Sequence, residues 1–130
     1  MMWQTLMYEH AELEYPNECC GVLLGNKDTS EICEIVPADN TDGYDIRNIH
    51  FAMDPLKIYK VERMALERGL EIIGFYHSHV DHPAIPSGED ERYMIPGLLY
   101  MIVSVEQGHC ADVRVYSKEC DQDIYIYSGL

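Results

Sequence analysis

The sequence predicts a single mixed α/β domain in which helices pack on a largely antiparallel sheet. Three observations favour this class. The chain has 130 residues, of which 47% are hydrophobic and 25% charged, and this composition suits one compact core. Short apolar segments of strand length alternate along it with two or three helical patterns. No repeat, linker or shift in composition interrupts it, so residues 1–130 are expected to form one domain.

Residues 5–15 are predicted to form the first helix, because side chains recur there at helical spacing before Pro16. Apolar runs at 20–24 and 32–36 are then expected to form strands. The polar segment 38–48, rich in Asp, Asn and Gly, should be a loop. The recurring residues of the first helix are Leu6, Met7, His10 and Leu13.

The second helix has clear signals at both ends. Asp54 is a suitable N-cap and Pro55 a suitable first helical residue. Gly69 stands where a left-handed C-terminal cap is expected. We therefore predict a helix over residues 56–68, whose buried stripe would consist of Ile58, Val61 and Ala65.

The remainder of the chain is typical of strands and one short helix. Residues 71–76 are predicted to form a strand, and a helix is expected to begin at Ser87 after a loop with two prolines. The last three strands are expected at 98–105, 111–116 and 124–127.

The charge of the chain disfavours some function classes. Nine Lys and Arg stand against 23 Asp and Glu, which gives a formal net charge of −14. Such a surface repels phosphate backbones and anionic lipids, so we expect neither a nucleic acid nor a membrane as partner. No apolar run approaches the roughly 18 residues of a membrane helix, and residues 1–5 lack the pattern of a secretory signal. A cytoplasmic location is expected.

The five cysteines agree with a reducing compartment. Their number is odd, they form no C-x-x-C pair, and adjacent Cys19 and Cys20 cannot form an unstrained disulfide with each other. We interpret the cysteines as reduced thiols that pack as small hydrophobic residues. A thiol of Cys19 or Cys20 that lines a groove is the alternative.

The residues that carry chemistry lie between positions 77 and 90. His77 and His79 are two residues apart at the end of a predicted strand, so their side chains leave the same face, about 6.6 Å apart along the backbone. Asp90 falls in the first turn of the next helix, where the helix N-terminus favours an ionised carboxylate. Two His and one carboxylate leave a position open for water, which is the catalytic rather than the structural pattern for zinc.

Each of these features is weak when taken alone. Ser87-x-x-Asp90 at a helix start is most often a capping box. A single His at a strand end is usually a polar terminus, and His82 is interpreted as a loop residue beside the pocket. The combination H-x-H-x7-S-x2-D, however, arises by chance in about one in a thousand chains of this composition. Together the residues therefore favour a metal site.

This combination resembles the signature of the JAMM, or MPN+, zinc metallopeptidases. The resemblance implies that His77, His79 and Asp90 hold Zn²⁺ and that the Ser87 hydroxyl stabilises the tetrahedral intermediate. It extends over residues 5–127 and implies the JAMM/MPN fold, which is similar to that of cytidine deaminases.

A second motif of the family implies a general acid/base. Residues 18–25, ECCGVLLG, resemble the family's E-x-C-G-x-L-x-G-like segment, which assigns that role to Glu18. Without the motif, Glu18 is an ordinary glutamate at the end of a loop. The one departure is Val80, where many bacterial members carry Pro, and it changes none of the implied catalytic groups.

The resemblance also implies a substrate. JAMM enzymes hydrolyse peptide or isopeptide bonds that follow the Gly-Gly tail of ubiquitin-like proteins. The chain is most similar to stand-alone prokaryotic Mec-like members, which trim the C-terminus of ubiquitin-like sulfur carriers. We therefore expect a zinc peptidase that cuts after the Gly-Gly of such a carrier. An isopeptidase that deconjugates ubiquitin-like modifiers and a catalytically inactive MPN scaffold are the alternatives.

The substrate is expected to lie extended across the metal, with the loops 38–48 and 80–86 as walls and a free strand edge as its backbone partner. A zinc nucleoside deaminase is disfavoured, because the P-C-x-x-C part of its signature does not occur.

Overall fold

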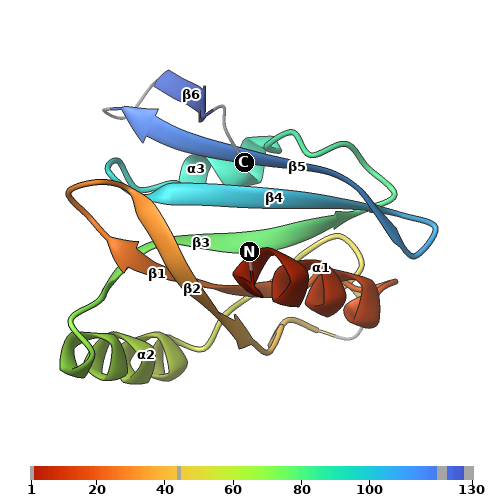
Figure 1. The fold of residues 1–130 in the computed structure, drawn as a ribbon. Helices are drawn as coiled ribbons and strands as arrows, with labels where there is room; N and C mark the ends of the chain where they lie inside the picture. The colour runs from red at the N-terminus through yellow and green to blue at the C-terminus, as the bar shows by residue number, and fades with distance from the viewer. Residues whose placement is uncertain (1, 44, 120–122, 128–130) are drawn as a thin grey trace.

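The computed structural model describes residues 2–43, 45–119 and 123–127 of the chain. All predicted helices and strands are present (Figure 1). The helices are α1 (Met2–Glu14), α2 (Pro55–Glu67) and α3 (Gly88–Tyr93). The strands are β1 (Cys20–Asn26), β2 (Glu31–Ala38), β3 (Glu71–Val80), β4 (Leu99–Glu106), β5 (His109–Glu119) and β6 (Asp123–Tyr127).

The strands form one six-stranded sheet in the order β2-β1-β3-β4-β5-β6. Neighbouring strands are antiparallel except β3 and β4, which run parallel. A parallel pair needs a crossover, and the chain between β3 and β4 makes it through α3. The predicted fold, a mixed and largely antiparallel sheet flanked by helices, is confirmed.

β3 is longer than the sequence predicted, because it reaches Val80 rather than residue 76. The added residues pair with β4, ending with Val80 opposite Val105. Residues 77–80 carry no apolar run that would mark a strand, so it is the pairing with β4, and with β1 at His77, that extends it. His77 and His79 therefore lie inside the strand.

The helical spacing of Leu6, Met7, His10 and Leu13 predicted α1 but only partly marks its buried face. Leu6 is 51% exposed and Leu13 80% exposed, whereas Met7 and Ala11 are fully buried. Met7 and Ala11, one turn apart, belong to the core between α1 and the sheet, together with the half-buried Trp3 and other aromatic side chains. Aromatic side chains beside Met7 thus decide which face of α1 is buried.

α2 begins and ends where the sequence predicted, within one residue. The Asp54 side chain accepts a hydrogen bond from the Leu56 amide at the N-terminus. Gly69 follows the C-cap with a φ of 71°, which a glycine adopts without strain. Val61 and Ala65 are buried as predicted. Ile58 is only half-buried, because it faces a cleft instead of the core.

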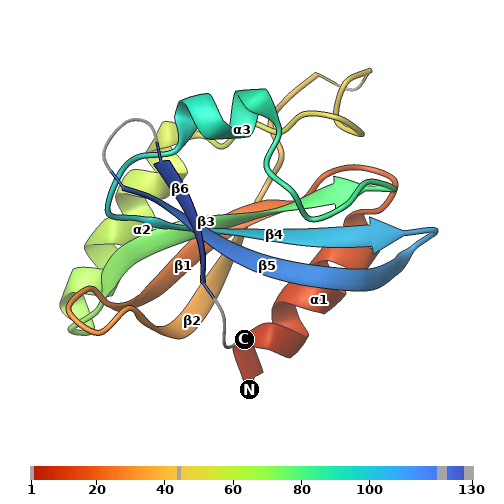
Figure 2. The same ribbon diagram turned by 90° about the horizontal axis from the view of Figure 1, so that it is seen from above.

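The helices divide between the two faces of the sheet. Figure 2 shows α1 on one side of the sheet and α3 on the other. α2 packs on the face opposite α1, through Val61 and Ala65 against Val22 and Leu24 of β1. The segment around α3 packs further along this face, where Met94, Ile102 and Tyr116 belong to one buried cluster. The cleft described below lies between these two packing regions, over β3.

Candidate metal centre

β3 and α3 bring three predicted ligands together. His77 and His79 lie two residues apart on β3, so both imidazoles project from the same face, and both residues are buried. α3 supplies Asp90. One ligand atom from each of these three residues lies within 4.8 Å of the other two, and the group could hold a metal ion.

Asp90 is held in place by the start of α3. The Ser87 hydroxyl oxygen accepts a hydrogen bond from the Asp90 amide at 3.0 Å, and Asp90 Oδ2 accepts one from the Ser87 amide at 2.9 Å. This is the capping box that the sequence predicted as the simpler interpretation of these residues. The capping box fixes the carboxylate beside the histidines, and the Ser87 hydroxyl hydrogen is still available for donation.

The imidazole of His79 has a defined orientation. Its Nδ1 lies 2.8 Å from the carbonyl oxygen of Pro83, which can only accept, so the proton is assigned to Nδ1. Its Nε2 faces Asp90 Oδ2 at 3.0 Å. A backbone carbonyl that holds one ring nitrogen while the other faces a metal is the usual support of a histidine ligand.

The imidazole of His77 is held by an aromatic ring. Phe51 stacks on it with a centroid distance of 4.6 Å and an interplanar angle of 24°. His77 Nε2 is buried and lies 3.3 Å from Asp90 Oδ1, yet it makes no hydrogen bond within the described part of the chain. A buried side-chain nitrogen in a folded protein normally has a hydrogen-bonding or metal partner. A divalent cation shared by two imidazoles and one carboxylate satisfies it, so the residues fit a metal.

The charges at this cluster are strongly coupled. Burial opposes the ionisation of Asp90, but its contacts with His77 and His79 and the Ser87 amide outweigh burial and hold its pKa well below the usual range. Burial lowers the pKa of His77 against the opposing effect of Asp90. For His79, burial also lowers the pKa, yet Asp90 and the Pro83 carbonyl produce a net rise. One carboxylate charge thus faces two imidazoles.

Glu18 lies just before β1, beside the histidines. Antiparallel pairing of β1 and β3 puts Cys20 opposite His77, and Glu18, two residues earlier in the chain, lines the same cleft as His77 and His79. Glu18 is only 7% exposed. Burial raises the pKa of its carboxyl to about 8, against the lowering effect of His79. A carboxyl with a strongly raised pKa next to a cluster of metal-ligating groups is typical of a functional site.

These residues line a cleft of about 1000 Å³. Apolar side chains form much of its lining, among them Phe75 and Tyr100, whose rings lie 6.2 Å apart. His82 also lines it, as predicted. The lining residues that come from segments 39–54 and 81–86 are Asp42, Ile49, His50, Phe51, Ala52, Met53, His82, Pro83 and Ile85.

The prediction of the cleft walls is partly wrong. Residues 80–86 contribute to one wall as expected, but the opposite wall consists mainly of residues 49–53, and only Asp42 comes from 38–48. The strand that carries the two histidines offers no free edge, because β3 is paired on both sides, by β1 and β4. Apolar residues in a polar loop, such as Phe51, were the signal in the sequence for this wall.

The two walls meet across the cleft. His50 Nδ1 lies 3.4 Å from Glu89 Oε1 of α3, and both side chains are partly exposed. Each partner is the sequence neighbour of a residue at the metal centre, His50 of Phe51 and Glu89 of Asp90. The pair thus narrows the cleft next to the cluster.

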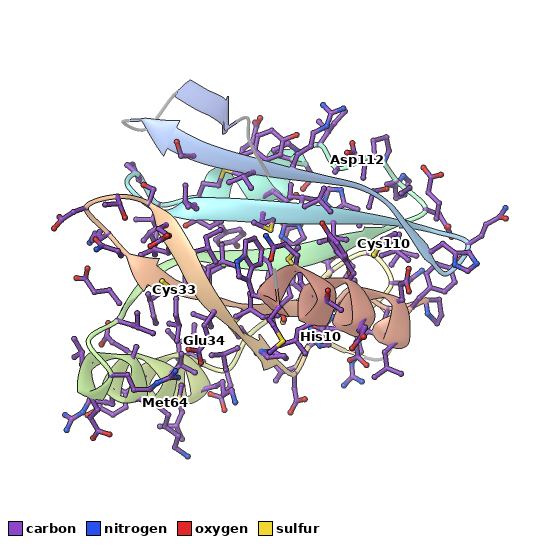
Figure 3. All side chains as sticks on the ribbon, viewed as in Figure 1. His10, Cys33, Glu34, Met64, Cys110 and Asp112 are labelled. Atoms are coloured by element: carbon purple, nitrogen blue, oxygen red, sulfur yellow. The ribbon has the colours of Figure 1, made fainter. Side chains whose placement is uncertain are left out.

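The described cysteines are free thiols, as predicted. Cys19 and Cys20 are buried, burial raises the pKa of each thiol to about 12, and neither is among the described residues that line the cleft. Cys33 lies on β2 and Cys110 on β5, with three strands between them (Figure 3).

Within the described residues, no helix combines the length and apolarity needed to cross a bilayer.

Comparisons with known proteins agree with this geometry. The family model of prokaryotic homologs of the JAB domain matches residues 2–116. A desampylase of Haloferax volcanii is 32% identical over 97 residues, which are 74% of this chain and 68% of that protein. The CysO-cysteine peptidase of Mycobacterium tuberculosis is 30% identical over 112 residues, 85% of this chain and 74% of that protein.

A solved structure extends the likeness to the whole fold. The solution structure of protein DSY2949 from Desulfitobacterium hafniense is similar with a TM-score of 0.82 and 29% identity, covering 97% of this chain and 86% of that one. The family match over most of the chain confirms the resemblance to the JAMM, or MPN+, proteins. The chain belongs to the prokaryotic JAB domain family.

Proposed function

We propose that the protein is a zinc-dependent peptidase that hydrolyses the bond after the C-terminal Gly-Gly of a ubiquitin-like sulfur-carrier protein. The observation that carries the proposal is the cluster of His77, His79 and Asp90 beside the buried Glu18 in one cleft. The names of the relatives, a desampylase and a CysO-cysteine peptidase, support cleavage of protein conjugates. Residues 1–130 would act as one domain, in a reducing compartment such as the cytoplasm.

His77, His79 and Asp90 would hold the zinc ion. Two nitrogen ligands and one carboxylate oxygen suit zinc and leave a position open. When bound there, zinc polarises the scissile carbonyl and lowers the pKa of water toward about 7. An MPN scaffold has no need of these ligands, so their meeting in one cleft favours the enzyme.

Glu18 and Ser87 would carry the protein's own share of the chemistry. Glu18 takes a proton from the attacking water and passes it to the leaving amine, as its place in the cleft beside the histidines allows. The Ser87 oxygen already accepts from the Asp90 amide, so its hydroxyl hydrogen is free to donate to the developing oxyanion. Deleting such a donor elsewhere costs about 2.7–4 kcal/mol of transition-state stabilisation.

The narrow passage beside the metal centre supports a Gly-Gly substrate. The His50–Glu89 contact joins the two walls next to the cluster, so a chain without side chains passes most easily. We expect a carrier fusion to be cut immediately after Gly-Gly. Replacing the last Gly by Ala should lower kcat/KM about 10- to 200-fold, the range for one misfitted methylene.

A panel of carrier fusions that differ only at this dipeptide, measured with purified zinc-loaded protein, checks the proposal. The control is an isopeptide conjugate of the same carrier, which reports whether isopeptidase cleavage is faster. Equal cleavage of Gly-Gly and Ala-Val fusions would show a broad-specificity peptidase instead. Absence of cleavage from every member would overturn the proposed function.

The stacking of Phe51 on His77 leads to a separate prediction about the metal. Phe51→Ala should weaken zinc binding about tenfold, because groups that orient a ligand contribute about 10- to 100-fold to metal affinity. Phe51→Tyr should retain it. Competition with a chromophoric chelator measures the affinity, and Ile49→Ala, on the same wall, is the control. Unchanged affinity in Phe51→Ala would contradict the role of the stacked ring.

A further inference from the structure

One buried amide in the loop after β2 joins Glu18 to the wall of the cleft. Asn40 is 8% exposed and uses both ends of its side chain. Its Nδ2 donates to the carbonyl oxygens of Glu18, at 2.9 Å, and His50, at 3.0 Å. Its Oδ1 accepts from the amides of Asp42 and Ala52, both at 3.1 Å. The two N–H groups each donate one hydrogen bond and the oxygen accepts two, so the hydrogen-bonding capacity of the amide is fully used.

Glu18 depends on this loop for its position, because it lies outside the sheet. β1 begins only at Cys20. The backbone groups of Glu18 both bond to the loop instead: its carbonyl accepts from Asn40, and its amide donates to the Arg47 carbonyl at 2.7 Å. The next residue is already tied to the sheet, since the Cys19 amide donates to Ser78 Oγ at 2.8 Å. Asn40 therefore fixes the residue that the sheet leaves unpaired.

The same amide fixes the wall that carries Phe51. His50 and Ala52 flank Phe51, and Asn40 bonds to the backbone of both. The Asn40 side chain thus holds the backbone of Glu18 on one side of the cluster. On the other side it holds the segment that carries Phe51, whose ring stacks on the His77 imidazole.

From this geometry we infer that Asn40 is a positioning residue, which holds the Glu18 carboxyl in line with the metal centre. The inference rests on the proposed function, in which Glu18 moves the proton. A displacement of about 1 Å at a reacting group can cost about 100-fold in rate. Asn40→Asp is the sharpest variant: it keeps the oxygen that accepts from Asp42 and Ala52 and replaces the donor to Glu18 and His50 by an acceptor.

A double-mutant cycle tests whether Asn40 acts through Glu18. The four proteins are the wild type, Asn40→Asp, Glu18→Gln and the double variant, all zinc-loaded and assayed on the Gly-Gly carrier fusion. We expect Asn40→Asp to lower kcat about 10- to 100-fold with zinc retained, and to cause no further loss in the Glu18→Gln background. An equal loss in both backgrounds, or loss of zinc, would overturn the inference. Thr41→Val, which removes only a side-chain bond to the Ala52 carbonyl, should keep kcat within about twofold.

A second measurement does not depend on activity. In Asn40→Asp, hydrogen exchange at the Glu18 amide should rise about tenfold, while the Cys19 amide, bonded to Ser78, keeps its rate. If Asn40→Asp unfolds below the assay temperature, Asn40→Ala takes its place in both experiments. If the wild type cleaves nothing but exchange at the Glu18 amide still rises in Asn40→Asp, the proposed function is overturned and the positioning by Asn40 is not. A normal wild type whose Glu18 amide and kcat ignore Asn40→Asp would overturn the inference alone.

Discussion

Replacing His77 by Ala is expected to abolish both zinc binding and hydrolysis while the sheet stays folded. A four-ligand structural zinc site binds with about 10–16 kcal/mol, roughly 2.5–4 kcal/mol for each ligand. Loss of one ligand should therefore weaken zinc binding about 100- to 1000-fold. Zinc content after dialysis and hydrolysis of the Gly-Gly fusion measure the two effects.

The fold should survive this change, because the main packing lies elsewhere. Met7 and Tyr76 belong to the core under α1, and Val22 and Val61 to the core under α2. Thermal unfolding in the presence of a chelator should show a cooperative transition for wild type and variant alike.

The third histidine of this region gives a matched control. His82→Ala removes an exposed imidazole from the lining of the cleft and should keep one zinc ion per chain. Retention of one zinc ion per chain by the double variant His77→Ala/Asp90→Ala would contradict the assignment of the metal ligands.

Much of the fold could be predicted because its signals are local. The ends of α2 follow from Asp54, Pro55 and Gly69, which act within one turn of the helix. The buried face of α1 could not be predicted in the same way. Leu6 is as apolar as Met7, and only the packing of the neighbouring aromatic side chains against the sheet decides which of them is buried.

The candidate metal centre was also within reach of the sequence, because two of its ligands lie on one strand and the third lies in the first turn of the next helix. The wall opposite α3 was not. It depends on hydrogen bonds from Asn40 to residues 10 and 12 positions further along an irregular segment. Such a segment has no periodicity, so an apolar residue such as Phe51 does not by itself show which part of the fold it contacts, and Asn40 does not stand out.

Replacing Glu18 by Gln is expected to lower turnover about 10²- to 10⁴-fold with zinc still bound. This range is the usual contribution of a positioned general acid/base. Zinc should remain because the ligand cluster consists of His77, His79 and Asp90 and does not include Glu18. Gln has nearly the same shape and keeps the backbone contacts of the residue. Steady-state kinetics together with zinc content per chain provide the check, and normal turnover would mean that another group moves the proton.

The same substitution should change the pH dependence of stability in the metal-free protein. Burial raises the pKa of Glu18 from its ordinary 4.5 to about 8, so the folded state binds this proton more tightly than the unfolded state. Its contribution is fully present below about pH 4.5 and is lost as the pH rises through about 8. Glu18→Gln carries no such proton, so the melting temperature of the variant should rise relative to that of wild type as the pH increases from about 4.5 to about 8. Above about pH 8 the difference between the two melting temperatures should stay constant. Thermal unfolding in chelator at a series of pH values measures the difference, and parallel curves throughout would contradict the raised pKa. With zinc bound, the nearby positive charge lowers the pKa of the carboxyl, and the gap between the two proteins should shrink.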